Sequence, residues 1–203
     1  MKKRTTMLAL LLATGAGTCL QAQEKLTQFK VRDAITVRTP IMNDSINPKG
    51  EKYADKDLLK TPVVLDLADA PFQVLSTDTA GVLSFPKVEK DHSIYLLETS
   101  LRAERFMTGK LKVTSPARWE IFINGESKMS KENAEDSISG ASTREVNLRL
   151  EPEADYEITI KLLSGSKDKA VPTLKCELIK DDKFKDITCF VSPEQKKRFA
   201  LPN

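Results

Sequence analysis

Residues 145–162 read EVNLRLEPEADYEITIKL, and apolar residues alternate with polar ones on both sides of Pro152. Successive side chains of a β-strand point to opposite faces of its sheet, so this period of two predicts two strands with one apolar face each. An antiparallel pair in which Leu150 faces Tyr156 keeps every apolar side chain on the same face. The stretch therefore predicts an antiparallel sheet with one buried side and one solvated side.

Apolar residues alternate again at residues 174–178 and 187–191, which predicts a second strand pair. A charged turn over residues 180–185 would then place Cys176 opposite Cys189. In an oxidising compartment these two cysteines can form a disulfide. The alternative is two reduced thiols that pack as small apolar groups in the core. We expect no metal site, because two thiols without a nearby histidine are an incomplete ligand set.

The remaining sequence contains short apolar runs separated by turn residues, and no long window has a convincing helical period. Asn124-Gly125 is a strong hairpin signal, because both central positions of a type I′ turn favour positive φ. We expect an all-β protein, an antiparallel β-sandwich of the jelly-roll type, with one domain over residues 23–191 and a tail at 192–203. The other expected strands lie at residues 29–37, 61–67, 72–75, 81–88, 92–101, 110–114 and 118–124, with 92–101 paired to 110–114 and polar loops at 40–61 and 127–142.

Residues 1–22 begin with three basic residues, continue with an apolar stretch and end on the small residue Ala22. This order is typical of a secretory signal peptide. A lipoprotein signal that uses Cys19 is the alternative. The apolar stretch is too short for a stable transmembrane helix. We therefore expect an exported chain without a membrane span, located in the periplasm or outside the cell.

The net charge of the whole chain is +3, but this value includes the three basic residues of the predicted leader. Of the 32 basic residues 29 then remain, against 29 acidic ones, and the two signs are interleaved along the chain. A nucleic-acid binder needs a basic surface that displaces counterions. We expect neither nucleic acid nor an anionic membrane surface as a partner.

The sequence contains a single histidine, His92, on which any Ser-His-Asp or Cys-His site would depend. Its place at the start of a predicted strand favours a structural surface residue. Motifs for a nucleophile elbow, a phosphate loop, a dinucleotide site or a zinc helix are missing from the sequence. The acidic loop around Glu135 does not follow the order of a calcium loop, which favours a solvated loop. We expect no catalytic residue, no metal and no cofactor.

The segment Trp119–Glu126 resembles the strand, Asn-Gly turn and strand of galactose-binding-like jelly rolls. In those modules the turn lies beside the ligand-facing loops. The resemblance implies Trp119, Asn124 and Gly125 as candidate binding residues, together with the loops at 102–108 and 126–142. Trp119 also shares a strand face with Ile121, which favours a position in the core.

Several short stretches resemble the N-terminal accessory region of secreted bacterial peptidases of the prolyl oligopeptidase and dipeptidyl peptidase family. These stretches are residues 43–46, 55–59, 78–81, 109–116 and 196–201. The resemblance implies a non-catalytic accessory module that contacts a protein or glycan surface, or the propeller and hydrolase domains that this chain lacks. The alternative function is a carbohydrate-binding module. An exposed Trp119 would favour sugar binding, because an aromatic sugar platform must be accessible.

Overall fold

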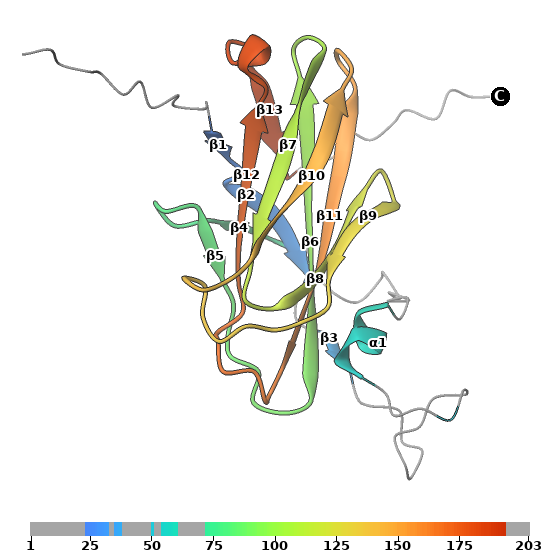
Figure 1. Ribbon diagram of the computed structural model, residues 1–203, viewed down its shortest axis with the longest axis vertical. Coiled ribbons are helices and arrows are strands. Elements are labelled where there is room, and N and C mark those ends of the chain that lie inside the picture. The colour runs from blue at the N-terminus through green and yellow to red at the C-terminus, as the bar shows by residue number, and fades with distance from the viewer. Residues whose placement is uncertain (1–22, 33–34, 38–49, 51–53, 61–71, 194–203) are drawn as a thin grey trace, which may run out of the picture.

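The computed structural model describes residues 23–32, 35–37, 50, 54–60 and 72–193. Over these residues the chain is an all-β sandwich of two antiparallel sheets, with one short helix beside it (Figure 1). The predicted fold class, an antiparallel β-sandwich, is confirmed. Among the helices of the described residues, none is long and apolar enough to cross a membrane.

The smaller sheet has five strands, which are β1 (Gln23–Lys25), β5 (Val82–Ser84), β7 (Met107–Thr114), β10 (Thr143–Leu150) and β12 (Thr173–Lys180). Their order is β1-β12-β7-β10, and β5 also pairs with β12. Along β10 the second half alternates strictly between exposed and buried residues. This strand therefore has the one apolar face that the sequence predicts.

The larger sheet has eight strands, which are β2 (Gln28–Arg32), β3 (Ile35–Val37), β4 (Phe72–Ser76), β6 (His92–Ala103), β8 (Arg118–Ile123), β9 (Glu126–Lys131), β11 (Asp155–Gly165) and β13 (Cys189–Ser192). The main order is β4-β2-β6-β11-β8-β9, and β3 and β13 pair with the two ends of β6. The long β6 is thus the central strand of this sheet. The predicted strand at 29–37 corresponds to β2 and β3.

The apolar faces of the two sheets meet in one continuous core. Trp119 and Ile160 enter it from the larger sheet, and Leu111 and Leu178 enter it from the smaller one, each with none of its surface exposed. Removal of this apolar surface from water is the main force that holds the sheets together, at about 25 cal/mol per Å².

The structure corrects the predicted pairing around residues 151–154. β10 pairs with β7, so Leu150 lies opposite Met107, and β11 pairs with β6, so Tyr156 lies opposite Leu101. The connection at 151–154 therefore crosses between sheets instead of folding back within one. Both apolar faces still point into the core, so the alternation is satisfied by either pairing. The predicted pairing of 92–101 with 110–114 is wrong for the same reason, because β6 and β7 lie in different sheets.

The structure also corrects the predicted pairing of the two cysteines. Cys176 lies in β12 opposite Val113 of the smaller sheet, whereas Cys189 lies in β13 opposite Ala103 of the larger sheet. Both are buried and free, so the expected disulfide is not formed. The Sγ atom of Cys189 instead contacts Sδ of Met107 at 3.3 Å. The 3-10 helix η1 (Asp182–Phe184) lies in the crossing between the two sheets.

The Asn124-Gly125 hairpin is confirmed, and it joins β8 to β9. Asn124 has φ of 52° and Gly125 has φ of 78°. These left-handed values are those that the turn requires and that Asn and Gly tolerate best. β9 extends to Lys131, so the loop expected at 127–142 begins later, at residue 132. The strand expected at 61–67, the predicted leader at 1–22 and residues 194–203 of the predicted tail lie outside the described residues.

Helix α1 (Asp55–Lys60) replaces part of the loop expected at 40–61. Its first turn is capped, because the Asp57 carboxylate accepts a hydrogen bond from the Ala54 amide at 2.8 Å. Leu58 and Leu59 pack in a small second apolar cluster on the outer face of the larger sheet, with Ile94, Leu96 and Leu163. Six residues are too few for a stable isolated helix, so this packing holds α1 in place.

Candidate functional site

Trp119 does not form a ligand-binding platform in this structure. Its side chain has none of its surface exposed, and it lies between Leu162 of β11 and Lys131 of β9 in the larger sheet. The strand face that it shares with Ile121 points into the core. This candidate contact is therefore corrected to a core residue, because the alternation of β8 places it inward.

Asn124 and Gly125 are exposed at the end of the β8–β9 hairpin, but the Asn124 side chain has a structural partner. Its Oδ1 atom accepts a hydrogen bond from the Glu157 amide at 2.8 Å, and the Asn124 amide donates to the Glu157 carbonyl at 2.8 Å. These bonds attach the turn to β11. A Cβ atom added at Gly125 would meet no atom within 4 Å, so the glycine serves the turn and not a close contact.

The loop after β9 is anchored by a buried lysine. Lys131 donates hydrogen bonds from Nζ to the Ser115 carbonyl at 2.5 Å and to Glu135 at 2.7 Å. Glu135 in turn accepts from the Ser142 amide at 2.8 Å. Burial lowers the pKa of Lys131 below its usual range, although the bond to Glu135 opposes this change. Glu135 is thus part of a structural network, and the described residues contain no group of three or more metal ligands.

A different part of the predicted binding loops is exposed. Phe106 lies in the turn between β6 and β7, and 37% of its surface is accessible. Its ring meets Phe184 of η1 edge to face, with centroids 5.8 Å apart and planes at 83°. The guanidinium carbon of Arg149, near the end of β10, lies 5.2 Å from the centroid of the Phe106 ring. Two connections and the end of strand β10 therefore contribute to one aromatic site, which we call the Phe106 site (Phe106, Arg149 and Phe184).

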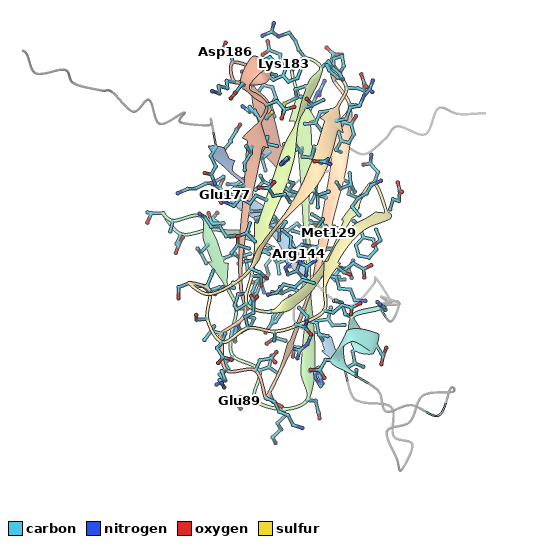
Figure 2. All side chains as sticks on the ribbon, in the orientation of Figure 1. Glu89, Met129, Arg144, Glu177, Lys183 and Asp186 are labelled. Carbon is cyan, nitrogen blue, oxygen red and sulfur yellow. The ribbon has the colours of Figure 1, made fainter. Side chains whose placement is uncertain are left out.

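The Phe106 site lies at the end of the sandwich where the β6–β7 turn, the β10–β11 turn and η1 come together, at the top of Figure 1. Lys183 and Asp186 are found at the same end (Figure 2). Charged and hydroxyl groups surround the rings: Thr108 donates a hydrogen bond to Asp181, and Arg149 pairs with Glu151 at 3.0 Å. The site combines an accessible aromatic ring with donors and acceptors at its rim.

Sequence reasoning named the 102–108 loop but not Phe106. A phenylalanine directly after the charged pair Glu104-Arg105 in a turn is the signal that could have identified it, since a loop on the surface has little core in which to bury the ring. The partner Phe184 could not have been found, because η1 is distant in the chain and joins Phe106 only in the folded protein.

A second polar cluster lies where α1 meets the larger sheet. Nε2 of His92 is 3.1 Å from Oδ1 of Asp55, whose other oxygen pairs with Arg118. Arg118 also contacts Asp168 at 2.9 Å, and Asp168 accepts a hydrogen bond from the Gly165 amide at 2.8 Å. His92 is therefore part of an ion-pair network between α1, β6, β8 and the connection after β11.

Comparison with known proteins gives no match to a protein family and no match to a curated protein. Among solved structures, the PA14 sugar-binding domain from an RTX adhesin is 13% identical, with a TM-score of 0.46, and covers 81% of this chain and 95% of that one. A β-glucosidase from Kluyveromyces marxianus in complex with glucose is 11% identical, with a TM-score of 0.44. An α-xylosidase from Xanthomonas citri is 9% identical, with a TM-score of 0.42.

The coverage of the two glycosidases is uneven. The aligned region spans 78% and 84% of this chain but only 16% and 17% of the β-glucosidase and the α-xylosidase. At these identities and TM-scores the similarities support no conclusion about function.

The resemblance to the accessory region of prolyl oligopeptidase-type peptidases is corrected by the same comparison. The chain is similar to PA14 domains and to parts of glycosidases, and not to the N-terminal regions of those peptidases. The short stretches that suggested the peptidases are only four to eight residues long. Of those that the structure describes, 55–59 lies in α1, 78–81 in the turn before β5, and 109–116 in β7 and the turn after it. The peptidase accessory role is therefore dropped.

Proposed function

We propose that this chain is a non-catalytic glycan-binding module that contacts sugar at the Phe106 site. The observation that supports this function is the exposure of the Phe106 ring, 37%, in a turn directly after the charged pair Glu104-Arg105. A large apolar side chain left accessible at a loop cluster is typical of a binding surface. We also propose that the two sheets have the jelly-roll arrangement of galactose-binding-like modules.

The chemistry of the Phe106 site fits a sugar ring. A pyranose has an apolar face of C–H groups and a rim of hydroxyl groups. The Phe106 ring would cover the apolar face, and the edge-to-face contact with Phe184 holds the ring in position. Arg149 and Glu151 would bond to hydroxyl groups, because a guanidinium donates and a carboxylate accepts.

The proposed location of the protein rests on the leader predicted at residues 1–22. We propose that residues 1–22 are removed on export and that the mature domain, residues 23–191, meets glycans in the periplasm or outside the cell. Amino-terminal sequencing of the exported protein tests this part. A mature chain that begins at Gln23 supports it, and a cytosolic chain that retains Met1 overturns it.

The binding proposal is tested with a glycan array followed by calorimetry on the best sugar. Phe106→Ala should weaken binding at least about tenfold, which corresponds to ~1.4 kcal/mol. The matched control is Val171→Ala, because Val171 is 47% exposed and lies in the connection between β11 and β12, at the opposite end of β6 from the Phe106 turn. Unchanged affinity in Phe106→Ala, or no binding of wild-type protein to any glycan on the array, overturns the proposal.

A further inference from the structure

Arg32 is a buried cation with two nitrogen atoms that lack an acceptor among the described residues. It ends strand β2, and only 5% of its surface is exposed. Its Nε and Nη1 atoms are buried and donate to no acceptor in the part of the chain that the structure describes. A buried guanidinium normally bonds to a carboxylate or carbonyl group, because an unsatisfied buried charge is costly.

The other buried cations of the described residues all have acceptors. Lys131 bonds to Ser115 and Glu135, and Lys161 donates to the Leu59 carbonyl. Lys180, the last residue of β12, donates to the Ile187 carbonyl. In Figure 1 β12 leads into η1. Arg32 is the exception to this pattern. A hydrogen-bond acceptor that is not among the described residues would satisfy the two Arg32 nitrogen atoms.

An aromatic ring covers one face of the Arg32 guanidinium. Strand β4 lies beside β2, with Phe72 opposite Arg32. The guanidinium carbon lies 4.0 Å from the centroid of the Phe72 ring. Stacking on a ring occupies a face of the guanidinium, whereas its N–H groups point outward in the plane.

A second cation contacts the same ring. Nζ of Lys30 lies 4.1 Å from the Phe72 centroid. Lys30 and Arg32 are two residues apart on one strand, so both belong to the outer face of the sheet. Two positive charges on one ring repel each other, and an anion between their donor groups would remove this repulsion.

Among the residues that the structure describes, the carboxylate beside this pair is that of Glu98, and it does not take that place. Glu98 lies opposite Lys30 in β6. Burial raises the pKa of the Glu98 carboxyl, and the charge of Glu157 raises it further, while Lys30 and Arg32 act in the opposite direction. The structure shows no hydrogen bond between Glu98 and Arg32. The local carboxylate thus leaves the guanidinium without an acceptor.

We propose that Arg32, Lys30 and Phe72 form a binding site for an oxyanion, and specifically for the carboxylate group of a ligand. A carboxylate accepts N–H bonds in the plane of a guanidinium, and its two oxygen atoms suit the planar donors of an arginine better than the point charge of a lysine. Phosphate offers the same oxygen acceptors but a tetrahedral shape. The site is separate from the Phe106 site and does not depend on the proposed function.

The test compares ligands that differ only in the carboxylate. Calorimetry or NMR titration with glucuronate and with glucose isolates that group, and inorganic phosphate forms a third arm. Wild-type protein should bind glucuronate at least about tenfold more tightly than glucose. Arg32→Met should abolish the difference, and Arg32→Lys should reduce it strongly, because a lysine is a point charge without the planar fork.

Two control variants establish that the preference for glucuronate comes from Arg32 and its neighbours. Lys112→Met removes a cation from the outer face of the other sheet and should leave the preference intact. Phe106→Ala should also leave it intact, so failure of the glycan proposal does not affect this test. Phosphate binding that exceeds glucuronate binding keeps the oxyanion site and overturns its assignment to carboxylates.

Stability provides a second readout that a purely structural arginine would not reproduce. Without ligand, Arg32→Met should melt at the same temperature as wild type or higher, because an unpaired buried charge is removed. Glucuronate should raise the melting temperature of wild type and not that of the variant. A variant that melts clearly lower, or a wild type that binds neither glucuronate nor phosphate at millimolar concentration, overturns the proposal.

Discussion

His92 and Asp55 lie side by side, with Nε2 of the ring 3.1 Å from Oδ1 of the carboxylate. The contact joins the first residue of β6 to the first residue of α1. Asp55 also pairs with Arg118, so a single carboxylate links the helix to two strands of the larger sheet. The packing of Leu58 and Leu59 holds the helix on the sheet, and this polar contact adds to its attachment.

Asp55→Asn should loosen α1. The substitution removes the negative charge that faces His92 and Arg118, and we expect a loss of about 1 kcal/mol, because Asp55 is partly exposed to solvent. Hydrogen exchange of residues 54–60 should speed up more than that of the core strands. Lys60→Gln is the control on the same helix, since the Lys60–Glu132 pair is exposed and should contribute little. Equal exchange in both variants would contradict the role of Asp55.

The single tryptophan should report the sandwich core. Trp119 is fully buried, so its emission should be shifted to the blue and should be insensitive to iodide and acrylamide. Sugars should leave this emission unchanged, because Trp119 lies away from the Phe106 site. Trp119→Ala should lower the free energy of unfolding by about 3–5 kcal/mol through the cavity it leaves. An indole that iodide quenches in the native protein would show that this core position is wrong.

Cys176 and Cys189 should be unreactive thiols in the folded protein. Burial raises the pKa of both thiols, so little thiolate is available for reaction. A thiol reagent at pH 8 should label neither cysteine until denaturant is added, and should then label both. A peptide map under non-reducing conditions is the independent check. A Cys176–Cys189 disulfide peptide in that map would contradict the strand assignment of β12 and β13.

Glu98→Gln should stabilise the protein at neutral pH. Burial raises the pKa of the Glu98 carboxyl, so the folded state binds the proton more tightly than the unfolded state does. The stability that the protonated Glu98 carboxyl contributes is fully present when the pH is below the pKa of this group in the unfolded state. It is lost as the pH rises through the pKa of the group in the folded state. Glutamine is neutral at every pH, so the variant should gain about 0.5 kcal/mol at pH 7 and nothing at pH 4, a modest value because Glu98 is half-buried.

Urea denaturation at several pH values measures this difference. Glu145→Gln provides the matched control, because the hydrogen bond from Lys110 lowers the pKa of Glu145. A lowered folded pKa contributes stability above the unfolded pKa, so this variant should lose stability at neutral pH. Opposite signs for the two variants are expected. The same sign for both would contradict the role of burial at Glu98.

The alternation at 145–162 and the Asn124-Gly125 turn were sufficient to predict an antiparallel β-sandwich. Both are local properties: a strand places successive side chains on opposite faces, and a tight turn needs residues that tolerate positive φ. The inward position of Trp119 follows from the same rule. Strand partners do not follow from it, because β10 satisfies its alternation equally well beside β7 or β11.

The amino-acid sequence by itself therefore determined which faces are buried and that the chain is an antiparallel β-sandwich. Only the tertiary structure decided which strands pair, that Cys176 and Cys189 lie in different sheets, and that Phe106 meets Phe184. It also showed that the buried Arg32 stacks on Phe72 and that two of its nitrogen atoms have no hydrogen-bond acceptor among the described residues. The physical reason is that burial periodicity is set within a strand, whereas pairing and sites depend on where the connections cross between the sheets.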